Sequence, residues 1–191
     1  MSLLVPVAFL LFFSSSTIFG MGSDEVERSE LCSKEVPPDP CTLPELKLDE
    51  RFGACGEKIE LGVTKDKPET VKFPDVGEDE QYVLVMVDPD VPSYNNPVTQ
   101  LWKHWVVAGI SGEALSAGTL DGFPLTSYMG PTPPPGKVHR YNFYLFKQTT
   151  EKIIGGDGSS RAYFNLADFM EKNNLCTPEA GFQFKTETLN K

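Results

Sequence analysis

The chain has 191 residues, 40% of them apolar, which is enough for one hydrophobic core but short of two full domains. Its formal net charge is −10, so long-range electrostatics repel nucleic acid and anionic membranes and argue against a nucleic-acid-binding protein. Any anionic ligand must therefore be bound by a few local groups.

Residues 1–22 have the features of a secretory signal peptide. Leu3 to Phe13 form a short apolar block, serine and threonine residues follow it, and no charged side chain precedes Asp24. The block is too short to span a bilayer, and Gly20 and Gly22 are small residues of the kind found near a cleavage point. We expect a secreted protein without a transmembrane span in the mature chain. A retained signal anchor is the alternative.

Residues 23–57 are acidic and contain several prolines, without a helical or strand period, so they predict an extended N-terminal leader. The even number of cysteines predicts two disulfides in an oxidising compartment, and the sequence leaves their pairing open. A zinc site is less favoured because no C-x2-C pair is present. The four cysteines are Cys32, Cys41, Cys55 and Cys176.

The following domain, residues 58–191, begins with two strand-like segments between Lys58 and Phe73, which predict a hairpin. The next run, Tyr82 to Val87, has no polar residue, so we expect a central strand that is covered on both faces. Asp88 and Asp90 follow it with the same parity, and an extended Asp88-Pro89 link would place both carboxylates on one rim. The simpler interpretation is an Asx-type turn.

After this loop, Trp102 to Val107 predict another strand, with His104 on one face together with Trp102 and Val106. Residues 108–122 are rich in small and turn-forming residues, which suits short strands and loops.

The stretch Gly130–Gly136 (GPTPPPG) predicts a rigid loop, because proline restricts the backbone and removes hydrogen-bond donors. A strand follows it, and the second histidine of the chain stands at the start of that strand. Two histidines that each lie where a strand meets a loop could line one cavity. The expected strand has His139, Tyr141, Phe143 and Leu145 on one face and Arg140, Asn142, Tyr144 and Phe146 on the other.

Asn165 followed by LADFME predicts a short helix with Asn165 as its N-cap, and Phe182 to Lys185 predict a last strand. No strand–helix alternation is present. The fold class that we expect is therefore a mostly β single domain, a β-sandwich with one or two short helices.

Four motifs occur in the order found in one protein family: DPDVPS, LWKHWVV, GPTPPPG with VHRYNFYLFKQ, and Arg161 with FNLADFMEKNNL. Over about residues 73–184 the chain thus resembles the phosphatidylethanolamine-binding protein family. The resemblance implies a sandwich of antiparallel sheets with a small anion pocket for phosphate, acetate or a phosphoethanolamine headgroup. It also implies regulation of kinases, proteases or signalling without catalysis. The signal-like segment and the leader with its cysteines look most like a secreted or lysosomal member.

The resemblance implies no catalytic residue, metal ligand or cofactor. Two departures from the family pattern concern the pocket: Thr99 stands where a pocket tyrosine is often found, and a longer C-terminal helix is not expected before Lys191, which predicts a more open mouth. Carried over by motif, the ligand-binding residues are Asp88, Asp90, Trp102, His104, Gly130, Pro131, His139 and Tyr141.

These residues make chemical sense as a receptor for a small anion or a phospholipid headgroup. Imidazole N–H groups and the Tyr141 hydroxyl can donate to anion oxygens. Asp88 can fix a histidine tautomer, carry a proton itself, or meet the ammonium of ethanolamine. We therefore expect anion binding to strengthen as the pH falls through the histidine range.

Two other functions compete with the anion receptor. Two aspartates and two histidines could hold a catalytic metal, but neither a G-x-S-x-G nor an H-E-x-x-H motif is present, so a hydrolase is less favoured. The second is a protein-interaction module, such as a protease inhibitor or a signalling modulator. It would bind its partner through the acidic leader at residues 24–50 and keep only a vestigial pocket.

Overall fold

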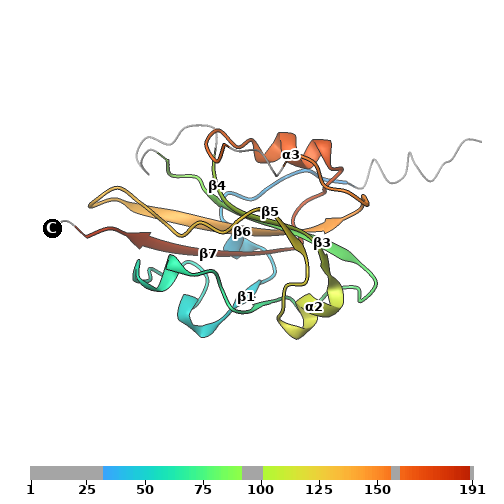
Figure 1. Ribbon diagram of the computed structural model, residues 1–191, viewed down its shortest axis with the longest axis horizontal. Helices are drawn as coiled ribbons and strands as arrows, with labels where there is room; N and C mark the ends of the chain where they lie inside the picture. Colours follow the sequence, from blue (N-terminus) through green and yellow to red (C-terminus); the bar gives the residue numbers. More distant parts are fainter. Residues whose placement is uncertain (1–31, 92–100, 156–159, 190–191) are drawn as a thin grey trace, which may run out of the picture. The chain divides into compact units, whose positions relative to one another are not determined.

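The computed structural model describes residues 32–91, 101–155 and 160–189 (Figure 1). The central element is a five-stranded antiparallel sheet with the strand order β5-β4-β3-β6-β7. A second, two-stranded antiparallel sheet pairs β1 with β2. The predicted fold class, mostly β with two sheets and few helices, is confirmed. The strands are β1 (Lys47–Leu48), β2 (Val71–Lys72), β3 (Gln81–Asp88), β4 (Trp102–Ser111), β5 (Phe123–Thr126), β6 (Val138–Gln148) and β7 (Ala180–Glu187).

Strand β3 lies in the middle of the large sheet, between β4 and β6, and is buried from Tyr82 to Asp88. Its alternate residues enter two different hydrophobic clusters. Leu84 and Met86 belong to one cluster, and Val83 and Val85 to the other. The prediction of a strand covered on both faces is therefore confirmed, because a run without polar residues needs apolar partners on each side.

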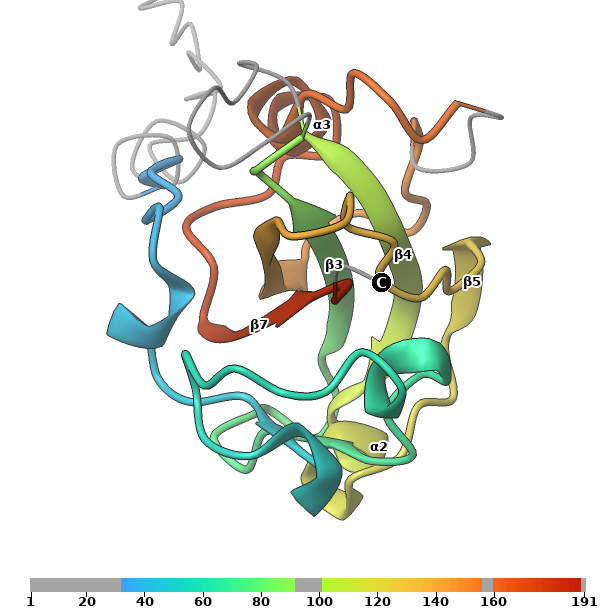
Figure 2. The ribbon, with the colours of Figure 1, turned by 90° about the vertical axis from the view of Figure 1, so that its left-hand side faces the viewer.

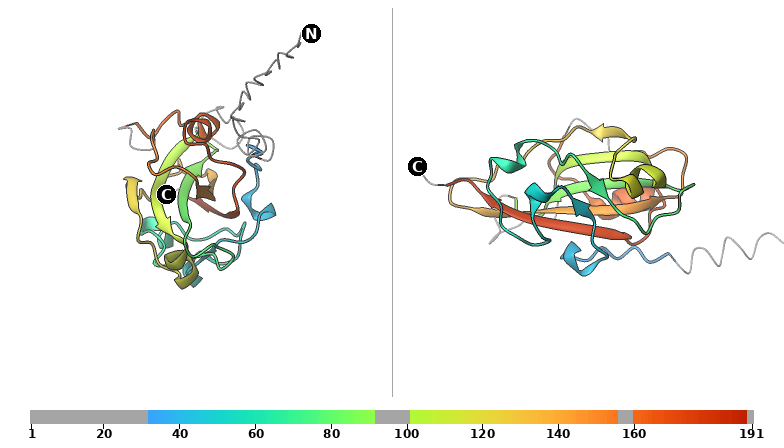
Figure 3. Two further views of the ribbon diagram at one scale, coloured as in Figure 1. Left: turned by 90° about the vertical axis from the view of Figure 1, so that its right-hand side faces the viewer. Right: turned by 90° about the horizontal axis from the view of Figure 1, so that it is seen from below.

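The two faces of the sheet are covered by different elements. Helix α3 (Leu166–Lys172) lies on one side, and α2 (Gly112–Ala117) with β1 lies on the other (Figures 1 and 3). As predicted, Asn165 caps α3: its side chain accepts a hydrogen bond from the Asp168 amide at 3.1 Å. Within the described ranges, no helix is long and apolar enough to cross a membrane.

Helix α2 falls where short strands and loops were expected. The Ser111 hydroxyl caps it by accepting from the Ala114 amide at 3.1 Å, and Gly118 ends it in the left-handed conformation. A serine before Gly-Glu-Ala and a glycine after the last turn are typical signals for the start and the end of a helix. These capping residues would have been enough to predict α2 from the sequence. The segment was misjudged because its small residues resemble a loop.

The hairpin predicted between Lys58 and Phe73 is wrong. Strand β2 pairs with β1 from the leader instead. The extended residues near Lys58 bind the edge of β7, where the Ile59 amide donates to the Lys185 carbonyl at 2.9 Å. The second of the two strand-like segments contains β2, whereas the first is extended only near Lys58 and then enters a turn and the 3-10 helix Val63–Lys65. Local alternation carries no information about which partner a segment meets.

The part of the leader that is described packs against the sheet. Leu46 and Phe52 are fully buried in the core, and two of the three 3-10 helices of the described residues belong to this region (Figure 2). Two disulfides are present, as predicted: Cys32–Cys176 and Cys41–Cys55. The predicted signal peptide, residues 1–22, lies outside the described residues. The 3-10 helices are η1 (Pro40–Thr42), η2 (Glu50–Phe52) and η3 (Val63–Lys65).

Candidate functional site

Three strand ends meet at one end of the large sheet. Strand β3 ends at Asp88, β4 begins at Trp102, and the antiparallel register places these two residues opposite each other. Strand β6 begins beside them, since its Asn142 is paired with Val87. A pocket of about 270 Å³ opens there. Its lining is Asp88, Val91, Trp102, His104, Thr132, Pro134, His139 and Tyr141, so five of the eight residues expected at the site line one hollow.

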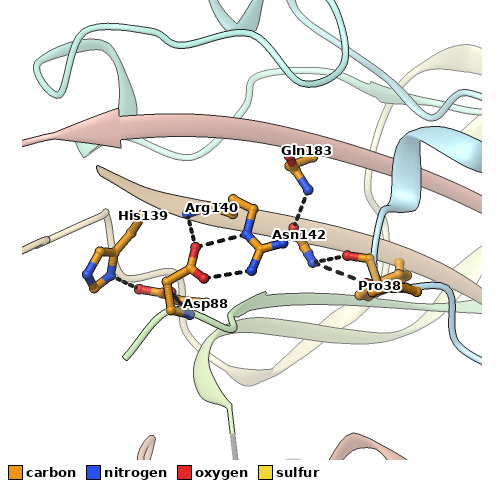
Figure 4. A network of polar contacts seen from close by, with 8 residues as sticks. Pro38, Asp88, His139, Arg140, Asn142 and Gln183 are labelled. Carbon is orange, nitrogen blue, oxygen red and sulfur yellow. Dashed lines mark hydrogen bonds and ion pairs between the residues drawn. The ribbon is translucent and has the colours of Figure 1, made fainter. Parts of the chain in front are cut away.

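Asp88 and His139, which both line this pocket, form a buried pair (Figure 4). Nδ1 of His139 donates to Oδ2 of Asp88 at 2.7 Å, and both side chains are almost completely buried. The Asp90 amide donates to Oδ1 of Asp88, also at 2.7 Å, which closes an Asx turn. Burial raises the pKa of Asp88, although the hydrogen bond from His139 opposes this shift. Nδ1 of His139 is thus engaged by the carboxylate, and its other ring nitrogen, Nε2, has no hydrogen-bond partner among the residues that the structure describes.

His104 enters the pocket through a β-bulge in β4. Met86 of β3 is opposite Trp105, whereas Val87 is opposite Lys103, so His104 is an additional residue in its strand. His104 and Trp105 therefore both face the side that carries the pocket, and Val106 joins the cluster on the opposite face. The expected common face of His104 and Trp102 is found, but Val106 does not share it because the bulge shifts the alternation.

The orientation of the His104 ring is fixed by Met129, which stands just before the proline loop. Nδ1 of His104 donates to the Met129 carbonyl at 2.7 Å, and the Met129 amide donates back to the His104 carbonyl at 3.0 Å. The guanidinium of Arg161 donates to the carbonyls of His104 and Ser127, both at 2.9 Å, and so ties β4 to the same segment. Burial lowers the pKa of His104 to about 4; the hydrogen bond with Met129 opposes this, and nearby Arg161 adds to it.

Tyr141 stands between the pocket and the core. Its ring stacks on Phe184 with a centroid distance of 5.1 Å and meets His104 edge-on, also at 5.1 Å. Burial, followed by the charge of Asp88, raises the pKa of Tyr141 well above its ordinary value, so the hydroxyl keeps its proton. Among the described residues neither this hydroxyl nor Nε2 of His139, both buried, makes a hydrogen bond of normal geometry, although the Thr132 backbone lies close enough to the hydroxyl to oppose the rise of its pKa. Two such groups beside one hollow suit a ligand with polar atoms.

Asp90 is placed elsewhere. Its carboxylate is fully buried and accepts from Arg140 three times: from the amide at 2.8 Å, from Nε at 3.0 Å and from Nη2 at 2.7 Å. Arg140 and His139 are successive residues of β6 and project to opposite faces of the sheet (Figure 4). The shared rim expected for Asp88 and Asp90 does not form, because the Asx turn interrupts the extended backbone on which equal parity depends.

Gly130 and Pro131 also lie outside the lining of this pocket. They border a neighbouring hollow of about 440 Å³, which shares only Thr132 with it. Gly130 packs against η3 so closely that a Cβ atom would lie 2.9 Å from the Thr64 carbonyl oxygen, so a glycine is required there. The proline loop instead contributes Thr132 and Pro134 to the pocket.

Sequence reasoning missed four contributors: Val91, Met129, Thr132 and Pro134. Val91 stands in DPDVPS, and Thr132 and Pro134 stand in GPTPPPG, so membership of these motifs was an available signal. The backbone carbonyl of Met129 has no sequence signal at all. Thr99, which the resemblance places where the family often has a pocket tyrosine, lies outside the described residues. In the part of the chain that the structure covers, no group of three or more His, Cys, Asp or Glu side chains is arranged to hold a metal ion.

The family profile described as phosphatidylethanolamine-binding protein matches residues 40–185. The chain therefore belongs to the phosphatidylethanolamine-binding protein family.

Solved structures of other proteins have the same fold. A phosphatidylethanolamine-binding protein from Plasmodium vivax is 25% identical, with a TM-score of 0.65 over 80% of this chain and 91% of that one. A phosphatidylethanolamine-binding protein from Plasmodium falciparum is 21% identical, with a TM-score of 0.62 over 87% and 97% of the two chains. A carboxypeptidase Y inhibitor, solved in complex with its cognate proteinase, is 24% identical, with a TM-score of 0.53 over 70% and 76%.

Proposed function

We propose that the protein is a non-enzymatic receptor for a small phosphate-bearing ligand, such as phosphate or a phospholipid headgroup of the phosphoethanolamine type. In this proposal it acts as a secreted or lysosomal modulator of signalling. The observation that carries it is a pair of buried polar groups that make no hydrogen bond of normal geometry within the described part of the chain, His139 Nε2 and the Tyr141 hydroxyl, on residues that line one hollow of about 270 Å³. A tetrahedral anion can accept a hydrogen bond from the Tyr141 hydroxyl, and from Nε2 of His139 when that nitrogen also carries a hydrogen.

The Asp88–His139 pair can present a hydrogen-bond donor to an anion. A His139 ring with hydrogens on both nitrogens would donate from Nε2 toward the pocket, and the buried Asp88 carboxylate would compensate its positive charge at Nδ1. Charge-assisted hydrogen bonds contribute on the order of 1.5–3 kcal/mol each. None of the described lining residues is a lysine or an arginine, so a protonated His139 is the strongest source of positive charge among them.

Two further observations support this reading over a protein-interaction role for the leader. The Tyr144 hydroxyl donates to the Pro37 carbonyl at 2.8 Å, and the Asn142 amide reaches the Pro38 carbonyl at 3.5 Å (Figure 4). This part of the leader is thus occupied by contacts with β6. The two disulfides are consistent with folding in an oxidising compartment. We therefore propose that the protein is secreted or lysosomal, like the secreted or lysosomal member of the family.

Calorimetric titration of phosphoethanolamine into the full-length protein at pH 7 and pH 5 tests the proposal. We expect saturable binding that is tighter at pH 5. The variant His139→Asn should bind at least about tenfold more weakly, because its amide can still donate to Asp88 but no longer reaches the ligand. Phosphate release assayed in the same samples tests the absence of catalysis.

The control is Lys172→Ala, which changes an exposed ion pair on α3 and should leave the affinity unaltered. The proposal fails if the wild-type protein shows no saturable binding at either pH, or if His139→Asn binds as tightly as the wild type. Release of inorganic phosphate at a steady rate would make the protein an enzyme.

A further inference from the structure

We propose that the pocket binds its phosphate ligand as the monoanion that keeps one P–OH group, and that this P–OH donates a hydrogen bond to Nε2 of His104. The site would then select phosphate monoesters over sulfate esters and phosphodiesters. This inference rests on the proposed function. It narrows the ligand from any phosphate-bearing group to a phosphate monoester that keeps one P–OH.

The tautomer of His104 follows from its partner. The Met129 carbonyl can only accept a hydrogen bond, so Nδ1, which lies 2.7 Å from its oxygen, must carry the hydrogen. In the neutral ring Nε2 then has a lone pair and no hydrogen. Because His104 lines the pocket and Nδ1 is engaged outside it, Nε2 is the atom that a ligand meets. An anion oxygen without a hydrogen would face this lone pair unfavourably.

The two histidines of the pocket have different partners and therefore different roles. His139 is bound to a carboxylate, whose negative charge can balance a positively charged ring. His104 is bound to a neutral carbonyl, which offers no such charge. One ring can thus serve as a donor while the other serves as an acceptor. A phosphate monoanion has the complementary set, bare oxygens and one O–H.

The groups around His104 keep its ring neutral. Asp88 at the end of β3 is engaged by His139 of β6, and Tyr141 of β6 presents an uncharged ring edge. Behind the ring, Arg161 places a positive charge on the backbone of His104 itself, which opposes a further proton.

The burial that lowers the pKa of His104 to about 4 acts in the same direction. A phosphate monoester gives up its second proton near pH 6. Between pH 7 and pH 5 the phosphate group of the ligand therefore gains a proton, whereas the His104 ring stays neutral. The resulting P–OH supplies the hydrogen of the bond to Nε2.

Three ligands of equal charge isolate this hydrogen bond. At pH 5 phosphoethanolamine, 2-aminoethyl sulfate and glycerophosphoethanolamine each have an ammonium group and one negative charge, but only phosphoethanolamine has a P–OH. Calorimetry with the wild-type protein at pH 5 should give phosphoethanolamine an affinity at least about tenfold higher than either of the others, the effect of one hydrogen bond. At pH 7 its binding should take up protons, as measured in two buffers that differ in ionisation enthalpy.

Two matched variants separate the roles of the histidines. In His104→Asn the side-chain amide can still donate to the Met129 carbonyl, but the pocket-facing nitrogen is lost. The ratio of affinities for phosphoethanolamine and 2-aminoethyl sulfate should then fall toward one. His139→Asn should weaken the binding of all three ligands and keep the ratio.

The possible failures are distinguishable. If none of the three ligands binds, the proposed function itself is overturned. If the sulfate ester binds the wild-type protein as tightly as phosphoethanolamine, or if His104→Asn keeps the full ratio, only the present inference is overturned. If glycerophosphoethanolamine binds as tightly as phosphoethanolamine, the pocket takes the diester of an intact phospholipid, and selection for the P–OH group is again overturned. The comparison of ligands on the wild-type protein is decisive even where a variant fails to fold.

Discussion

Replacing Asp90 by alanine is expected to lower the free energy of unfolding by about 3 kcal/mol. Asp90 is fully buried and accepts three hydrogen bonds from Arg140, two of them from the guanidinium. Its removal leaves the Arg140 amide and side chain without these acceptors at the end of the central strands. Urea unfolding at pH 7 under oxidising conditions measures the change.

The matched control is Asp168→Ala, which removes an exposed carboxylate bonded to Lys172 at 2.8 Å and should cost less than about 0.5 kcal/mol. The Asp90→Ala protein should also be titrated with phosphoethanolamine. A large loss of affinity with unchanged stability would place Asp90 among the ligand-binding residues, as the family motif implies, and would contradict the structural role assigned here.

The second large effect is a fall in stability between pH 6.5 and pH 4 that is caused by His104. The pKa of this ring is about 4 in the folded protein, against an ordinary value of 6.5, because burial disfavours the charged form. Below pH 6.5 the unfolded chain takes up a proton at this residue while the folded protein does not. The contribution of His104 to stability is therefore fully present above pH 6.5 and decreases by about 1.4 kcal/mol per pH unit, roughly 3 kcal/mol in total by pH 4.

Urea unfolding of the wild type and of His104→Asn at a series of pH values from 7 to 4 measures this contribution. Other groups titrate in the same range; the raised pKa of Asp88, for example, acts in the opposite direction, because the folded protein then takes up a proton more readily than the unfolded chain. The difference between the two proteins removes these common contributions. Equal pH slopes for wild type and variant would show that His104 is not held neutral by the fold.

Local sequence signals predicted the elements whose causes are local. The absence of polar residues from Tyr82 to Val87 indicated the central strand, and the alternation after His139 gave both faces of β6 correctly. Asn165 indicated the start of α3 because its side chain caps that helix directly. In each case the residues that fix the structure are neighbours in the chain.

The errors arose where a distant partner decides the outcome. The bulge at His104 exists only relative to β3, so counting along β4 alone placed Val106 on the wrong face. Strand β2 found its partner in the leader, which no alternation within residues 58–73 can indicate. Which residues of the proline loop border the pocket depends on how closely Gly130 approaches Thr64, a contact between segments more than sixty positions apart.

The bulge makes ligand recognition depend on a count of residues as well as on their identity. Deleting Lys103 would restore regular pairing between β3 and β4, because His104 would then stand opposite Val87, and the His104 imidazole would turn toward the other cluster. A relative that has the same aromatic residues and histidine, but one residue fewer before the next core position, would therefore keep the fold and lack a pocket-facing imidazole nitrogen equivalent to Nε2 of His104. The number of residues between the tryptophan at the start of β4 and the next core tryptophan is therefore the first property to compare when phosphate binding is considered for other proteins of this fold.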